Sequence, residues 1–164
     1  MKFMKKESLA IVPGSFDPMT NGHLDIIRRA ALTFDRVCVA VMINDQKQYM
    51  FSMAEREEIA KACISEIKNA YVISSDGWLW KLAKNLGASA IVKGYRNTED
   101  LEYEKEMAKF NSEHYPEAET ILLLSKEEFS ALSSTVVREK ILNGESLEGF
   151  VPKKAIQVIE KMRT

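Results

Sequence analysis

The stretch Pro13–His23 gathers residue types that bind phosphate. Its two glycines and two prolines force a tight path and let the backbone come close to a ligand. Ser15 offers a hydroxyl, and His23 falls where a helix is expected to begin, beside unpaired amide N–H groups that favour anions. Any one of these residues is usually just part of a strand-to-helix turn. Together they favour a phosphate site.

Two further segments carry groups that could reach a phosphate. Lys93 and Arg96 flank Gly94 after an apolar run, which offers a point charge and a planar guanidinium fork. Taken alone, this pattern fits a basic surface turn. Ser133–Thr135 places three successive hydroxyls at the start of another expected helix, where one ordinary N-cap needs a single hydroxyl. We therefore expect hydroxyls and free amides to converge there.

Several isolated residues could take part in the site only if the fold places them close to it. Lys47 lies in an expected loop, where a lysine is usually only solvated. Glu104 and Asn111 share a helix face with apolar residues, and a carboxylate there needs a partner. Trp78 and Trp80 could line a pocket, although core packing or a subunit contact is the more usual role.

The elements that must position these groups follow from the apolar pattern. Short apolar runs predict the strands Leu9–Val12, Val37–Met42, Ala70–Ile73, Ala90–Val92 and Thr120–Leu124. Amphipathic segments between and after them predict the helices Asn21–Phe34, Ser52–Ile67, Trp78–Leu86, Thr98–His114, Ser134–Asn143 and Pro152–Met162. This order predicts an α/β fold, a doubly wound five-stranded parallel sheet with C-terminal helices, in one domain spanning residues 1–164. Ligands of such sheets bind at the carboxyl ends of the strands.

The composition of the chain argues against several classes of protein. The chain has 164 residues, 46% hydrophobic and 29% charged, and a net charge of −1, which argues against a duplex nucleic-acid binder. Two histidines and two separated cysteines, Cys38 and Cys63, argue against a zinc site and fit buried thiols in a reducing compartment. The basic start Met1–Glu7 lacks a signal-peptide core, and no apolar run is long enough to cross a membrane. We therefore expect a cytoplasmic protein.

These residues carry a resemblance to a known family. Thr20–His23 matches the T/H-x-G-H motif of the nucleotidyltransferase superfamily. The full set resembles the bacterial phosphopantetheine adenylyltransferases, in order and spacing, from Leu9 to Pro152. The matching pieces are Pro13–His23, Lys47 with Phe51–Ser52, Gly94 and Arg96, Asp100–Glu104, Asn111, and Ser133–Arg138.

The resemblance implies a Rossmann-like nucleotidyltransferase fold and the reversible reaction of ATP with 4′-phosphopantetheine, the penultimate step of coenzyme A biosynthesis. It also implies a homohexamer, and Mg²⁺ held mainly by substrate phosphates rather than by protein ligands. His23 would stabilise the transition state, with Lys47 and Arg96 as the other catalytic residues. The ATP-binding residues would be Ser15, Phe16, His23, Gly94, Tyr95, Arg96, Glu104, Phe129, Ser130, Ala131, Leu132, Ser133, Ser134 and Thr135. The residues facing phosphopantetheine would be Ser15, Lys47, Leu79, Lys93 and Asn111.

The chain departs from the usual family pattern at several positions. Lys93 stands where arginine is usual, Tyr95 replaces a leucine, Asp45 replaces a proline, and Ser112 replaces a basic residue, whereas Ser15 for threonine keeps the hydroxyl.

Three alternatives remain open. The chain could be a nucleotidyltransferase acting on nicotinate mononucleotide or a phospho-alcohol, a nucleotide sensor without turnover, or an oligomeric scaffold.

Overall fold

The computed structural model describes residues 5–164; Met1–Met4, part of the basic start of the chain, lie outside the described residues. Five parallel strands form one sheet in the order β3-β2-β1-β4-β5. The strands are β1 Leu9–Gly14, β2 Arg36–Met42, β3 Ala70–Ser75, β4 Ala90–Tyr95 and β5 Glu119–Leu124. The α-helices are α1 Asn21–Thr33, α2 Met53–Cys63, α3 Leu79–Leu86, α4 Thr98–His114, α5 Ser134–Leu142 and α6 Lys153–Met162, with a 3₁₀ turn at Glu127–Phe129.

This topology confirms the predicted doubly wound sheet with C-terminal helices. The element boundaries differ in places. β1 and β4 run two and three residues beyond their predicted ends, so Lys93 and Gly94 lie within a strand and not in a surface turn. α2 ends at Cys63, four residues early, because the chain turns there to enter β3. Within residues 5–164, no helix is both long and apolar enough to cross a membrane.

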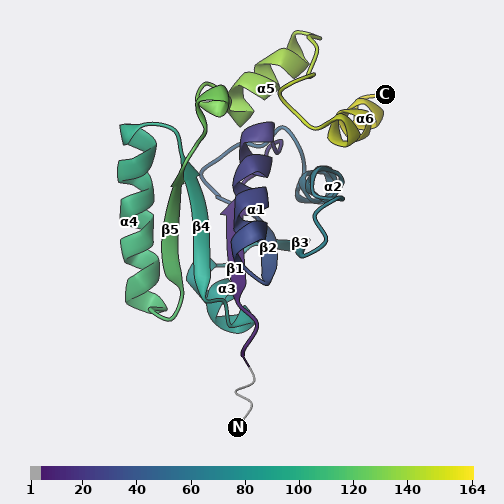
Figure 1. Ribbon diagram of the computed structural model, residues 1–164. Helices are drawn as coiled ribbons and strands as arrows, with labels where there is room; N and C mark the ends of the chain where they lie inside the picture. The colour runs from purple at the N-terminus through teal and green to yellow at the C-terminus, as the bar shows by residue number, and fades with distance from the viewer. Residues whose placement is uncertain (1–4) are drawn as a thin grey trace.

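Both faces of the sheet are covered. Along β2, Val37, Val39 and Val41 point into the larger core with α1, α2, α5 and α6, whereas Cys38 and Ala40 point into a smaller core beside α3. In Figure 1, α1 lies in front of the sheet and α3 behind it. Burial on both faces explains why the strands read as nearly continuous apolar runs.

The two central strands separate toward their carboxyl ends. β1 pairs with β2 over its whole length, but with β4 only at Ala10 and Ile11. Beyond those pairs, the ends of β1 and β4 diverge at the point where the strand order reverses. In open α/β sheets this reversal leaves a crevice that ligands occupy.

Candidate active site

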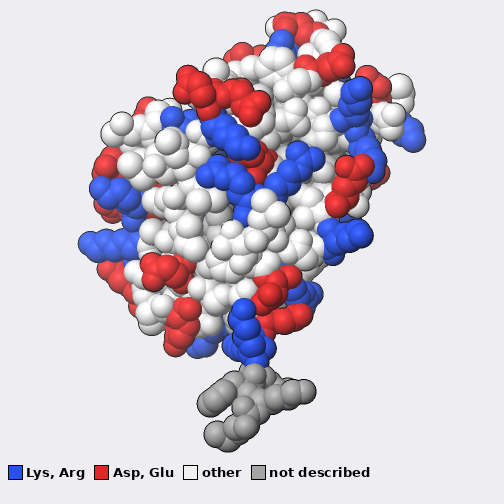
Figure 2. Space-filling view, viewed as in Figure 1, with Lys and Arg blue, Asp and Glu red and all other residues white. Residues whose placement is uncertain are grey.

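A cavity of about 580 Å³ occupies this crevice, within the range of small-molecule sites. Its walls come from the ends of β1 and β4, the start of α1, the loop before α2, the inner face of α4 and the start of α5. Figure 2 shows Lys and Arg side chains gathered on the upper part of this face, with acidic side chains among them.

Most of the predicted site residues meet at this cavity. Its lining includes Ser15, Phe16, His23, Lys47, Lys93, Gly94, Arg96, Glu104, Phe129, Leu132, Ser133, Ser134 and Thr135. Five predicted residues do not line it, namely Leu79, Tyr95, Asn111, Ser130 and Ala131. Leu79 packs against the smaller core, and Asn111 is buried in α4.

The two tryptophans lie elsewhere. Trp78 packs against Phe110 with ring centroids 5.4 Å apart, and Trp80 stacks on His114 at 5.1 Å. Trp78 is 58% exposed on the surface formed by α3 and α4. Neither side chain belongs to the cavity.

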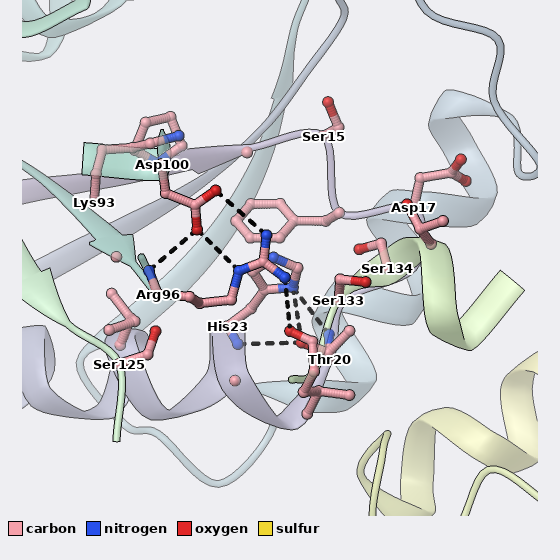
Figure 3. A pocket seen from close by; sticks show the side chains of 18 of the residues that line it. Ser15, Asp17, Thr20, His23, Lys93, Arg96, Asp100, Ser125, Ser133 and Ser134 are labelled. Carbon is pink, nitrogen blue, oxygen red and sulfur yellow. Dashed lines mark hydrogen bonds and ion pairs between the residues drawn. The ribbon is translucent and has the colours of Figure 1, made fainter. Parts of the chain in front are cut away.

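A reciprocal capping box fixes His23. Thr20 is the N-cap of α1, and its hydroxyl oxygen accepts the His23 N–H at 3.3 Å. The His23 Nδ1 in turn accepts the Thr20 N–H at 3.0 Å (Figure 3). Ser52 and Glu55 make the same arrangement at the start of α2. The three-residue spacing of the T-x-G-H motif is therefore the spacing of a capping box, with histidine in the place of glutamate.

The capping contact determines which ring nitrogen of His23 carries the proton. Because Nδ1 accepts the Thr20 N–H, the proton of the neutral ring lies on Nε2. Burial, followed by the positive charges of Lys93 and Arg96, lowers the pKa of His23 to about 4. The ring also meets Phe16 edge to face, with centroids 5.2 Å apart. His23 is thus a neutral N–H donor, held in place by its capping box, in a cavity that cationic side chains also line.

Carboxylates hold two of the cations in place. Arg96 donates from Nε and from its backbone N–H to Asp100, at 2.9 and 3.1 Å (Figure 3). Burial opposes ionisation of Asp100, but these hydrogen bonds and the charges of Arg96 and Lys93 hold its pKa below the ordinary value. Lys93 Nζ lies 3.4 Å from Glu104, which supplies the partner that a carboxylate on that helix face needs.

The three hydroxyls at the start of α5 have separate partners. Ser133 is the N-cap and accepts the Val136 N–H at 3.2 Å. Ser134 donates to the Pro18 carbonyl at 2.8 Å, and the Thr135 hydroxyl accepts from Arg138 at 3.1 Å. Two of the hydroxyls therefore link α5 to the turn after β1, directly or through Arg138.

Sequence reasoning missed Asp17, which is 3% exposed at the back of the cavity. Its carboxylate oxygens accept the N–H groups of Met50 and Phe51, at 2.9 and 3.0 Å. Arg138 donates to the Asp17 carbonyl at 2.8 Å, and its Nη1 lies 3.8 Å from the carboxylate. Asp17 thus connects the turn after β1 with the loop before α2. No local pattern could reveal this, because the partners lie more than 30 residues away.

The donor set does not form a metal cage. Among residues 5–164, no three His, Cys, Asp or Glu side chains lie together as a metal site. The acidic side chains of the cavity are already engaged, Asp17 with amides and Asp100 and Glu104 with cations. The cavity instead presents hydroxyls, cations and N–H donors, which are groups that hold phosphate.

Comparison with known proteins identifies the family. A model of the Cytidylyltransferase-like family matches residues 11–140. A phosphopantetheine adenylyltransferase of Caldanaerobacter subterraneus subsp. tengcongensis is 46% identical over 144 residues, covering 88% of this chain and 90% of that protein. A phosphopantetheine adenylyltransferase of Shouchella clausii is 39% identical over 153 residues, covering 93% of this chain and 96% of that protein. The chain belongs to the phosphopantetheine adenylyltransferase family.

The fold of this family member also resembles a solved structure. A Vibrio parahaemolyticus protein, provisionally described as a nicotinate-nucleotide adenylyltransferase, superposes with a TM-score of 0.71, covering 95% of this chain and 93% of that one. At 18% identity, this likeness establishes the shared nucleotidyltransferase fold and nothing about the acceptor substrate.

Proposed function

We propose that this phosphopantetheine adenylyltransferase family member transfers the adenylyl group of ATP to 4′-phosphopantetheine, giving dephospho-coenzyme A and pyrophosphate. The observation that carries the proposal is a neutral His23, held by its capping box, beside three cations in one cavity: Lys47, Lys93 and Arg96. Such an arrangement suits a transition state in which negative charge spreads over phosphate oxygens.

The chemistry needs no general base. A phosphate oxygen of phosphopantetheine attacks the α-phosphorus of ATP, and the bond from that phosphorus to the bridging oxygen breaks. Pyrophosphate leaves with the electron pair. A phosphate monoester has a second pKa of about 6, so the nucleophile is largely ionised at neutral pH. This agrees with His23, whose Nδ1 is occupied and whose Nε2 is protonated, so that neither nitrogen can accept a proton.

Each side chain then has a distinct task. The His23 Nε2–H donates to a phosphate oxygen and strengthens that hydrogen bond as charge develops. Arg96, oriented by Asp100, and Lys47 balance the charge of the phosphates. We assign ATP to the turn after β1, the end of β4 and the start of α5, and the phosphate of phosphopantetheine to Lys47 and Lys93. Contacts of Leu79, Tyr95, Asn111, Ser130 and Ala131 with either substrate remain predictions.

Mg²⁺ enters this proposal as part of the ATP substrate. Mg²⁺ keeps much of its water and is commonly bound through substrate phosphates with few protein ligands. The cavity fits that mode, because its carboxylates already hold amides and cations. When bound, the ion neutralises phosphate charge.

We also propose a cytoplasmic homohexamer, as the family resemblance implies. Exposed apolar side chains on neighbouring elements offer a surface for subunit contact, namely Trp78, Tyr103, Met107 and Leu124. Both cysteines are free and buried, as expected for a protein of a reducing compartment. Sedimentation of the purified protein tests the oligomeric state.

The deciding experiment incubates the protein with ATP, Mg²⁺ and 4′-phosphopantetheine and detects dephospho-coenzyme A by mass spectrometry. Parallel reactions with nicotinate mononucleotide as acceptor, or with CTP as donor, separate the rival nucleotidyltransferases. Binding of ATP without any product would instead indicate a nucleotide sensor. In the active protein, His23→Ala should lower turnover by about a hundredfold, the loss typical of one transition-state donor.

A further inference from the structure

Arg56 places a positive charge in the interior of the protein. Its side chain lies in α2, is 1% exposed, and makes no ion pair among the described residues. Its Nε has no hydrogen-bond partner in the part of the chain that the structure describes. A buried cation is costly unless other groups compensate it. Arginine stays protonated in proteins, so the surroundings of Arg56 must accommodate the charge.

The groups around Arg56 come from the two walls of the cavity. Nη1 donates to the Ser15 carbonyl at 2.6 Å, in the turn after β1, and to the Met42 carbonyl at 2.9 Å, at the end of β2. The guanidinium carbon also lies 4.0 Å from the centroid of the Tyr49 ring. Ser15 and Tyr49 both line the cavity. Arg56 therefore sits one layer behind the cavity wall and touches both of its sides.

Tyr49 extends this contact to the loop that carries Lys47. The Tyr49 hydroxyl accepts the Asn44 N–H at 2.6 Å and so closes the loop across its base. Lys47 lies between these two residues, is exposed, and has no carboxylate partner within residues 5–164. The position of its ammonium group thus depends on a loop whose base rests on the guanidinium of Arg56.

We propose that Arg56 is a positioning residue for adenylyl transfer, which fixes the Lys47 loop relative to the phosphate-binding turn at Ser15. The inference rests on the proposed function. Its chemistry requires arginine, because a planar guanidinium can reach two carbonyl oxygens while its face stacks on an aromatic ring. The ammonium of a lysine is a single point and cannot keep all three contacts.

A double-mutant cycle tests the coupling. R56K alone should lower kcat by about tenfold to a hundredfold, as expected when a catalytic group is misplaced by about 1 Å. In a K47A background, the same substitution should lower kcat by less than about twofold, because the group to be positioned is already gone. Two losses that simply multiply would overturn the proposal. As a matched control, R36K removes an arginine stacked on Tyr71 at the opposite end of β2 and should leave kcat unchanged.

A second measurement does not depend on turnover. Hydrogen exchange of the free protein should show lost protection over residues 43–51 in R56K, with unchanged protection in α6. Unchanged exchange of the loop would refute the positioning role. If R56K does not fold, Tyr49→Leu should lose more protection over this loop than Tyr49→Phe, because both variants lose the hydroxyl but only leucine also loses the ring that stacks on Arg56. Equal losses in the two variants would refute the positioning role. Absence of dephospho-coenzyme A from the wild-type protein would defeat the proposed function, and the exchange result would still decide whether Arg56 holds the loop.

Discussion

The protonation state of His23 leads to a prediction about how rate varies with pH. With a pKa of about 4, His23 is an imidazolium in only about 0.1% of molecules at pH 7. An unperturbed histidine, with a pKa of about 6.5, would be about 3% charged at pH 8 and about 91% charged at pH 5.5. A mechanism that needed the charged ring would therefore gain about thirtyfold over this interval. A mechanism that uses the neutral Nε2–H would gain nothing.

His23→Gln is the matched variant, because its amide keeps an N–H donor that does not titrate. We expect kcat to fall by about tenfold, because a Gln amide that accepts the Thr20 N–H through Oε1 holds its own N–H at a different position from the His23 Nε2–H. This loss is smaller than the hundredfold expected for alanine. The decisive quantity is the ratio of kcat/KM for ATP between the wild-type protein and H23Q. That ratio should stay constant within about twofold from pH 8 to pH 5.5, because a pKa near 4 leaves the ring neutral throughout.

The assay follows initial rates of pyrophosphate release at low ATP, where kcat/KM reports the ionisation of the free enzyme. Ionisation of the substrate phosphates affects both proteins equally and cancels in the ratio. A ratio that rises about thirtyfold toward pH 5.5 would refute the neutral-donor mechanism. Nitrogen chemical shifts supply an independent check, because they distinguish a ring protonated on Nε2 from an imidazolium. H23Q assigns the signals, since His114 is the only other histidine.

Three further predictions concern stability and reactivity. Burial lowers the folded-state pKa of His23 to about 4, so the unfolded chain takes up the proton first as the pH falls below 6.5. At pH 4, measured by urea unfolding, the free energy of unfolding should therefore fall by up to about 3 kcal/mol more in the wild-type protein than in H23Q. Partial exposure of the ring reduces this difference. Gly94→Ala would place a Cβ 2.8 Å from Cγ1 of the buried Ile26, and should lower the free energy of unfolding by about 1–3 kcal/mol in the same assay. Burial raises the pKa of Cys38 to about 11 and of Cys63 to about 12. At pH 8, iodoacetamide should leave both thiols unmodified in the folded protein and alkylate both in urea, as mass spectrometry will show.

Local sequence was enough to predict the sheet but not the ends of its strands. Each strand shows as an apolar run because both faces of the sheet are buried. The Lys93–Tyr95 segment reads as a turn, since it contains a cation and a glycine. It nevertheless continues β4 by pairing with Leu122, Leu123 and Leu124 of β5. That pairing depends on a neighbouring strand, which the local pattern does not reveal.

The location of the site followed from topology, whereas its fine structure did not. Strand order brought Ser15, His23 and Arg96 to one sheet edge, as predicted. The pairing of Arg96, just before the N-cap of α4, with Asp100 in the first turn of that helix could have been sought from their four-residue separation. The role of Arg56 could not have been found in this way, because Arg56 is surrounded by glutamates in the sequence of α2, a pattern typical of a solvated helix face. Its burial arises only when α2 packs behind the two cavity walls.

Positive and negative side chains nearly balance in the lining of the cavity, which determines how the cavity can act on phosphates. Its lining carries four cations and three carboxylates, so the local surplus of positive charge is small, in keeping with a chain of net charge −1. Two of the carboxylates orient or pair with the cations. Asp100 fixes the direction of the Arg96 guanidinium, and Glu104 lies within ion-pair distance of Lys93. Groups held in place before a ligand arrives need little reorganisation as charge develops, which is the condition for effective electrostatic catalysis. Orientation, more than the amount of charge, is what this fold supplies.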